Sequence, residues 1–157
     1  MRNFKLIYLK SSKEEWLEKA QAVYVNKLSH FVNFEIQEIK TKSLSRSNKL
    51  EKIKHEKDLI LNKLSKGDYL VALDEAGKTF DSSRAFSKKL DKLLYDNQKI
   101  VFLIGGSYGL HSEIKERANL LISLSKLTMS HHVAQVSFLE QLYRAFSIMK
   151  GLPYHND

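Results

Sequence analysis

The most informative segment for the fold is Ile100-Val101-Phe102-Leu103-Ile104-Gly105-Gly106-Ser107-Tyr108-Gly109-Leu110. Its first five residues are apolar without a break, which is typical of a strand buried on both faces of a parallel sheet. Three glycines follow within five residues, and glycine lets a ligand approach the backbone or the chain turn tightly into a helix. The G-G-x-x-G spacing matches neither the dinucleotide fingerprint nor the P-loop. The stretch therefore predicts a buried strand whose carboxyl end is a candidate ligand-binding edge.

Strands and helices are expected to alternate on both sides of this stretch. Apolar-rich segments predict further strands at 4–9, 34–39, 69–73 and 120–124. Apolar residues at helical spacing predict helices at 13–29, 49–65, 82–95, 112–119 and 133–150. Ser12 with Glu15 resembles a capping box at the first helix, and residues 74–78 read as a polar turn. This order predicts an α/β fold with a mainly parallel sheet, as a single domain over residues 1–157.

The amino-acid composition excludes several classes of functional site. The chain has 157 residues, no cysteine, and a net charge of +8 from 26 basic and 18 acidic residues. The lack of cysteine excludes a disulfide framework, a Cys-ligated metal site and a thiolate nucleophile, including the covalent Cys adduct of RNA C5-methylation. Nine basic and three acidic residues lie within 40–66. That segment is either a surface that grips nucleic-acid phosphates or an ordinary solvated helix face with a loop before it.

The sequence lacks the patterns expected of a membrane span, a signal peptide and a metal site. No apolar run approaches the roughly 20 residues that a membrane helix needs. The first residues turn polar too soon for a signal peptide, so a cytoplasmic protein without a membrane partner is expected. His131 and His132 are adjacent, but without a Cys or a His-x-x-x-His pattern they predict no metal site.

Two later segments carry polar residues where a ligand could bind. Residues 123–132 are small and polar between apolar elements, and their backbone groups could read an adenine edge. Glu140 and Arg144 stand at i,i+4, which an ordinary helix-surface pair explains. Tyr154 and His155 in the tail are either frayed or placed to stack on and hydrogen-bond a nucleobase.

The order of three segments, 102–110, 123–131 and 139–155, closely resembles the ribosomal large-subunit methyltransferase H family, a single-domain branch of the SPOUT methyltransferases. The resemblance implies a SPOUT-type fold with a C-terminal trefoil knot that forms the S-adenosylmethionine pocket. It also implies a homodimer that methylates N3 of a pseudouridine in helix 69 of 23S rRNA, within the assembled 70S ribosome.

The resemblance also assigns site residues by position. The positions expected to contact S-adenosylmethionine are Leu73, Gly105, Leu124, Ser125, Lys126, Leu127, Thr128 and Met129. The positions expected around the substrate base are His131, Arg144, Tyr154 and His155, with the tail meeting the other subunit's cofactor. Two departures concern substrate positioning: Ser130-His131-His132 replaces the usual Pro-His-Gln, and Gln135 replaces the usual Arg.

The implied reaction leaves its proton acceptor open. Pseudouridine N3 must lose a proton, and either His131 or His155 could accept it. Arg144 could stabilise the developing anion or hold a phosphate. Two other functions remain: a SPOUT methyltransferase acting on tRNA, and a non-catalytic ribosome-associated RNA-binding protein. Binding of S-adenosylmethionine would exclude the second.

Overall fold

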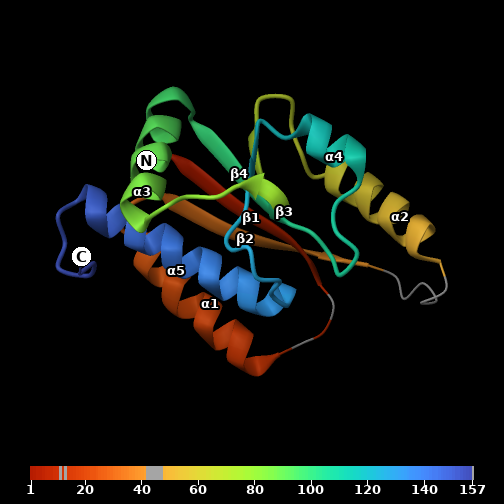
Figure 1. The fold of residues 1–157 in the computed structure, drawn as a ribbon, viewed down its shortest axis with the longest axis horizontal. Helices are drawn as coiled ribbons and strands as arrows, with labels where there is room; N and C mark the ends of the chain where they lie inside the picture. The colour runs from red at the N-terminus through yellow and green to blue at the C-terminus, as the bar shows by residue number, and fades with distance from the viewer. Residues whose placement is uncertain (11, 13, 42–47, 157) are drawn as a thin grey trace.

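The structure is a computed structural model that describes residues 1–10, 12, 14–41 and 48–156. Within these residues, five strands form one parallel sheet in the order β2-β1-β4-β3-β5 (Figure 1). The strands are β1 (Asn3–Lys10), β2 (Asn33–Lys40), β3 (Tyr69–Lys78), β4 (Lys99–Ile104) and β5 (Leu120–Ile122). The apolar run 100–104 is buried in the central strand β4. The predicted parallel α/β fold is therefore confirmed.

Helices cover both faces of the sheet (Figure 1). On one face lie α1 (Glu15–Leu28), α3 (Ser83–Asp96) and α5 (His131–Met149), and on the other lie α2 (Lys49–Leu61) and α4 (Ser112–Arg117). Alternate residues of a strand point to opposite faces. Phe4, Leu6 and Tyr8 of β1 accordingly join the first layer, and Ile7 and Leu9 join the second.

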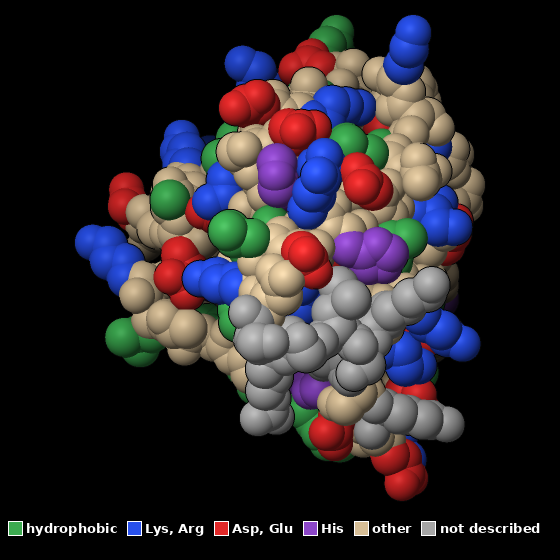
Figure 2. Space-filling model, turned by 90° about the vertical axis from the view of Figure 1, so that its right-hand side faces the viewer, with side chains coloured by type: hydrophobic (Ala, Val, Ile, Leu, Met, Phe, Trp, Pro, Cys, Tyr) green, Lys and Arg blue, Asp and Glu red, His purple; other side chains and the backbone are tan. Residues whose placement is uncertain are grey.

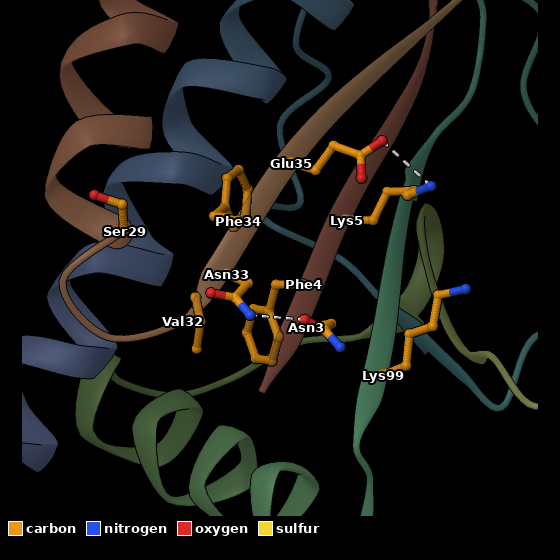
Figure 3. Close-up of a pocket in the computed structure, with 9 residues that line it drawn as sticks. All are labelled: Asn3, Phe4, Lys5, Ser29, Val32, Asn33, Phe34, Glu35 and Lys99. Carbon is orange, nitrogen blue, oxygen red and sulfur yellow. Dashed lines mark hydrogen bonds and ion pairs between the residues drawn. The ribbon is translucent and has the colours of Figure 1, made fainter. Parts of the chain in front are cut away.

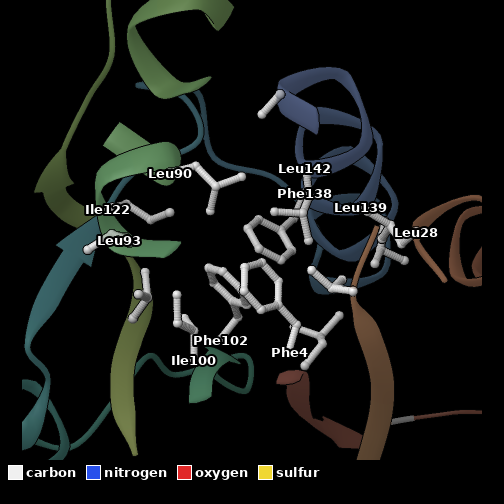
Figure 4. Packing of buried hydrophobic residues seen from close by; sticks show 14 of the residues in the cluster. Phe4, Leu28, Leu90, Leu93, Ile100, Phe102, Ile122, Phe138, Leu139 and Leu142 are labelled. Carbon is white, nitrogen blue, oxygen red and sulfur yellow. The ribbon is translucent and has the colours of Figure 1, made fainter. Parts of the chain in front are cut away.

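Three aromatic rings fix α5 to the central strands. Phe102 of β4 lies 4.8 Å from the ring of Phe138 on α5 and 5.3 Å from the ring of Phe4 on β1. All three are fully buried (Figure 4), and burial of such a side chain contributes about 1.5–3 kcal/mol. The helix that begins beside the predicted ligand edge is thus held by its middle to the sheet.

Several predicted boundaries are wrong. The polar residues 74–78 continue β3 instead of forming a turn, because the strand shifts register so that both Leu73 and Lys78 pair with Ile122. Ser12 does not cap α1, whose N-cap is Glu14 without a side-chain hydrogen bond. The predicted elements 49–65, 112–119 and 120–124 end earlier, at Leu61, Arg117 and Ile122.

The last helix starts earlier than predicted, at His131. Its N-cap is Ser130, whose hydroxyl accepts from the Val133 N–H at 3.4 Å. His131 and His132 therefore belong to the first helical turn and not to the preceding loop. The helix ends at Met149, and Gly151 follows with φ +64°.

The basic segment is only partly described. Lys42 and Arg46, with residues 43–45 and 47, lie outside the described residues. Around α2 and α4 the remaining charge is mixed, and Figure 2 shows basic and acidic side chains interspersed over this end of the molecule. Lys57 pairs with Asp58 at 3.3 Å and with Glu113 at 3.4 Å. The described part of this surface is therefore less positive than the sequence count indicates.

Candidate active site

A cavity of about 800 Å³ opens beside the second half of β3 and the carboxyl ends of β4 and β5. Leu73 of β3 pairs with Ile104 of β4 and with Ile122 of β5, so the segments that follow these residues meet at one edge. Residues from all three segments and the start of α5 line the cavity. This is the edge at which the sequence predicts a ligand, and the volume suits a cofactor-sized molecule.

Most of the residues predicted to contact a cofactor line this cavity. They are Leu73, Gly105, Leu124, Ser125, Leu127, Thr128 and Met129. Lys126 is exposed and does not line it. Of the residues predicted around the substrate, His131 lines the cavity, whereas Arg144, Tyr154 and His155 do not.

The glycine turn leaves backbone open to the cavity. A Cβ on Gly105 would lie 2.7 Å from Cδ2 of Leu110, and one on Gly106 would lie 3.0 Å from Oε1 of Glu56. Gly109 has φ +82°, which disfavours any residue with a side chain. Gly109 is therefore favoured by its backbone conformation, whereas a Cβ at Gly105 or Gly106 would have to displace the end of a neighbouring side chain. All three glycines line the cavity with backbone alone.

Hydrogen bonds between residues close in sequence, and one to the end of β3, hold the loop from 123 to 130. The buried Ser123 hydroxyl donates to the carbonyl of Ser125 at 2.9 Å, and the Ser125 hydroxyl accepts from the Leu127 N–H at 2.9 Å. The Ser123 N–H donates to the carbonyl of Lys78 at 2.9 Å. The carboxyl end of β3 therefore anchors this loop. The sequence-based prediction of a turn at residues 74–78 did not include this role.

His131 faces the cavity from the first turn of α5. Burial lowers its pKa, and the neighbouring His132 and Lys52 lower it further. A histidine with a pKa below its usual 6.5 is neutral at pH 7. Its imidazole is then in the form that can accept a proton.

The other three substrate-facing candidates gather at the far end of α5, around Glu140. Arg144 donates from Nε and Nη2 to the Glu140 carboxylate, and the Tyr154 hydroxyl donates to it at 3.1 Å. Nη1 of Arg144 lies 3.2 Å from Nδ1 of His155. Burial and the nearby Glu140 raise the pKa of Tyr154. We call Glu140, Arg144, Tyr154 and His155 the tail cluster.

Sequence reasoning missed Glu140 as the centre of this cluster. It read the Glu140–Arg144 spacing as a surface pair, and nothing local shows that the tail folds back onto it. Lys27 of α1 adds a second cation, with its ammonium 4.9 Å from the ring centroid of Tyr143 and 5.5 Å from that of Tyr154. A positively charged, aromatic surface results, of the kind that binds bases and phosphates.

A second hollow lies at the opposite edge of the sheet, near the amino ends of β1, β2 and β4. Four of its polar side chains pair with one another: Lys5 with Glu35 at 3.3 Å, and Asn33 with Asn3 at 3.0 Å (Figure 3). These partners leave it less suited to a polar ligand than the cavity at the carboxyl edge.

Across the described ranges, no helix has the length and apolarity to cross a membrane. In that same part of the chain, no group of three His, Asp or Glu side chains could hold a metal ion.

Comparison with known proteins gives a consistent set of relatives. The family described as "Predicted SPOUT methyltransferase" matches residues 2–155. A protein of Bdellovibrio bacteriovorus named ribosomal RNA large subunit methyltransferase H is 41% identical over 154 residues, covering 98% of each chain. Proteins of the same name from Christiangramia forsetii and Streptococcus uberis are 40% and 39% identical, each covering at least 96% of this chain and 98% of its own.

Solved structures agree on the fold. A probable methylase family protein from Haemophilus influenzae superposes with a TM-score of 0.56 at 11% identity, covering 98% of this chain and 70% of its own. A structure from work on 2-OH methylation of C/U34 on tRNA has a TM-score of 0.50 at 16% identity, covering 96% and 98%.

Proposed function

The chain belongs to the SPOUT methyltransferases and, within them, to the ribosomal RNA large subunit methyltransferase H family, and we propose that it methylates N3 of a pseudouridine in helix 69 of 23S rRNA. The methyl donor is S-adenosylmethionine, and the substrate is the assembled 70S ribosome in the cytoplasm. The whole chain acts as one SPOUT domain, with its C-terminal part tied in a trefoil knot around the cofactor pocket.

The cavity fits such a cofactor. Its bare backbone at Gly105 and Gly106 and its ordered loop from 123 to 130 supply peptide groups for an adenine and a ribose. Seven of the eight predicted contact residues line it. When bound, S-adenosylmethionine supplies a methyl group already activated by its sulfonium. The protein then needs to orient the base and to manage the proton on N3.

One observation carries the proposal that the active site is shared between two subunits. His131 lines the cavity and Arg144 belongs to the tail cluster, yet both lie on α5. They are thirteen residues apart, which is about 20 Å at 1.5 Å per helical residue. A base that contacts both groups must therefore meet the cavity of one subunit and the tail cluster of another, as in a homodimer with two composite sites.

An apolar surface supports such a dimer. Trp16 and Val23 of α1 and Val133 of α5 are 48%, 52% and 46% exposed. The Trp16 ring lies 6.2 Å from that of His132, so α1 and the start of α5 form a continuous face beside the cavity. Covering this face with a second copy would bury it and bring a partner's tail close to the cavity.

The reaction is tested by transfer of tritiated methyl from S-adenosylmethionine. The acceptors are 70S ribosomes that lack the modification, free 50S subunits, naked 23S rRNA and bulk tRNA, with the labelled nucleoside identified by mass spectrometry. N3-methylpseudouridine formed on 70S ribosomes alone is expected. Label on tRNA, or on another position of the rRNA, would overturn the proposed substrate.

Sharing between subunits is tested by mixing two inactive variants. Thr128→Trp fills the cavity from an exposed loop position, and Arg144→Ala disables the tail cluster. Refolded together, half of the dimers carry one intact composite site, so about a quarter of the wild-type activity should return. If the mixture stays inactive while each variant alone remains dimeric, both groups come from one subunit and the proposal fails.

A further inference from the structure

The contact between Arg144 and His155 determines which nitrogen of the imidazole carries hydrogen. Nη1 of Arg144 lies 3.2 Å from Nδ1 of His155. A guanidinium has only donors, so Nδ1 must be the acceptor. A neutral imidazole that accepts at Nδ1 carries its hydrogen on Nε2. In this arrangement His155 is the Nε2–H tautomer.

Arg144 is held firmly in the donating position. The Glu140 carboxylate accepts from Nε at 3.1 Å and from Nη2, which leaves Nη1 directed at the histidine. The guanidinium also lies 4.9 Å from the ring centroid of Tyr154, whose hydroxyl binds the same carboxylate. The bond to Glu140 raises the pKa of Arg144 further, so the guanidinium stays charged.

The same contact occupies the only ring nitrogen that could take a second hydrogen. A second proton on the ring could go only to Nδ1, where it would face an N–H of Arg144. Accepting a proton at His155 would therefore require breaking the contact.

We propose that His155 is a hydrogen-bond donor to the substrate and not its proton acceptor, and that Glu140 and Arg144 are the positioning residues that fix its tautomer. This inference rests on the proposed function. His155 presents Nε2–H to a carbonyl oxygen beside N3 and stabilises the negative charge that develops there. The N3 proton passes to His131, the histidine lining the described part of the cavity. The bond from methyl to N3 forms as the bond from methyl to sulfur breaks, leaving a neutral thioether.

The tautomer can be measured in the isolated protein. Long-range nitrogen–proton NMR of the ¹⁵N-histidine-labelled chain distinguishes a protonated ring nitrogen from an unprotonated one. At pH 7.5 His155 should show an unprotonated Nδ1 and a protonated Nε2, and Arg144→Ala should abolish this bias. The exposed His30 serves as the internal reference, because it should not change. A His155 with hydrogen on Nδ1, or one unaffected by Arg144→Ala, would overturn the inference.

Two substitutions test the donor role in methyl transfer. His155→Gln keeps an N–H near the position of Nε2 but cannot act as a base, whereas His155→Ala keeps neither property. We expect His155→Gln to retain activity within about tenfold, and His155→Ala to lose roughly 10²–10³-fold in turnover. The pH dependence of turnover should survive His155→Gln and should disappear in His131→Gln. Equal losses for His155→Gln and His155→Ala, with the pH dependence gone in both, would make His155 the base.

Different results would contradict the proposed function and the donor role of His155. If the wild-type protein methylates no ribosomal pseudouridine, the proposed function falls, while the NMR result still decides the tautomer. If the wild-type protein is active but His155 carries hydrogen on Nδ1, only the donor assignment falls.

Discussion

The side-chain amide of Gln21 on α1 donates to the side-chain carbonyl of Gln135 on α5 at 2.7 Å, and both residues are buried. Gln135, where the family resemblance implies an Arg, therefore faces the α1–α5 interface of this chain. Gln21 also hydrogen-bonds the Tyr8 hydroxyl, whose pKa burial raises. Nε2 of Gln135 has no hydrogen-bond partner among the described residues. Gln135 thus acts here by packing two helices together, one turn from His131.

Removing one partner of this pair should cost more than removing both. Gln21→Met leaves the buried amide of Gln135 without its bond, and should lower the free energy of unfolding by about 1–3 kcal/mol. The double variant Gln21→Met, Gln135→Met removes both amides and should recover most of that loss. Urea denaturation measures both, with the exposed Gln98→Met as control. A double variant less stable than the single one would contradict the argument.

Gly77 should matter for cofactor binding although it is outside the glycine turn. A Cβ there would lie 2.5 Å from the backbone carbonyl carbon of Ile122, which cannot move without shifting β5 and the loop anchored at Ser123. We expect Gly77→Ala to weaken S-adenosylmethionine binding by roughly tenfold or more, a loss of about 1.4 kcal/mol. Calorimetric titration measures it. Gly67→Ala, where a Cβ meets nothing within 4 Å, should leave the affinity unchanged.

Arg144→Ala should lower turnover but leave the affinity for S-adenosylmethionine nearly unchanged. Arg144 is assigned to the substrate base and is not among the cofactor contacts, so binding of S-adenosylmethionine should change by less than about twofold while turnover falls roughly 10²–10³-fold. Radiolabelled transfer and equilibrium binding on the same preparation make the comparison. The exposed Lys150→Ala, near the end of the same helix, should alter neither quantity. An equal loss in turnover and affinity would instead indicate a structural role for Arg144.

The buried Glu56 should make stability depend on pH. Burial raises the pKa of its carboxyl above the ordinary 4.5, against the lowering effect of Lys52 and His55. The folded state then holds this proton to higher pH than the unfolded state does. Its contribution to stability is full below pH 4.5 and is lost as the pH rises through the raised folded-state pKa.

Glu56→Gln should remove this dependence. Relative to wild type, the variant should gain stability as the pH is raised from 4 towards 8, because it has no charge to bury. Urea denaturation at several pH values checks this, with Glu51→Gln on the exposed side of α2 as the matched control. A stability difference that stays flat with pH would show that Glu56 ionises equally easily in both states.

The secondary-structure elements and the α/β fold class could be predicted from the amino-acid sequence. The apolar run 100–104 could be satisfied only by a strand covered on both faces, and helical spacing marked the five helices to within a few residues. The strand ends predicted at Leu73 and Ile104 also indicated the ligand edge, because carboxyl ends of parallel strands meet at one side, although β3 itself continues to Lys78. These are properties of local periodicity and burial, which a sequence records directly.

Contacts between residues far apart in the sequence became visible only in the folded structure. The register shift that carries β3 on to Lys78 depends on pairing with β5, more than forty residues later. The burial of Gln135 depends on Gln21, 114 residues away. The assembly of the tail cluster on Glu140 depends on the turn at Gly151 folding the tail back onto α5. Such contacts leave no periodic signal, because they join single side chains whose partners are set by how the helices pack on the sheet.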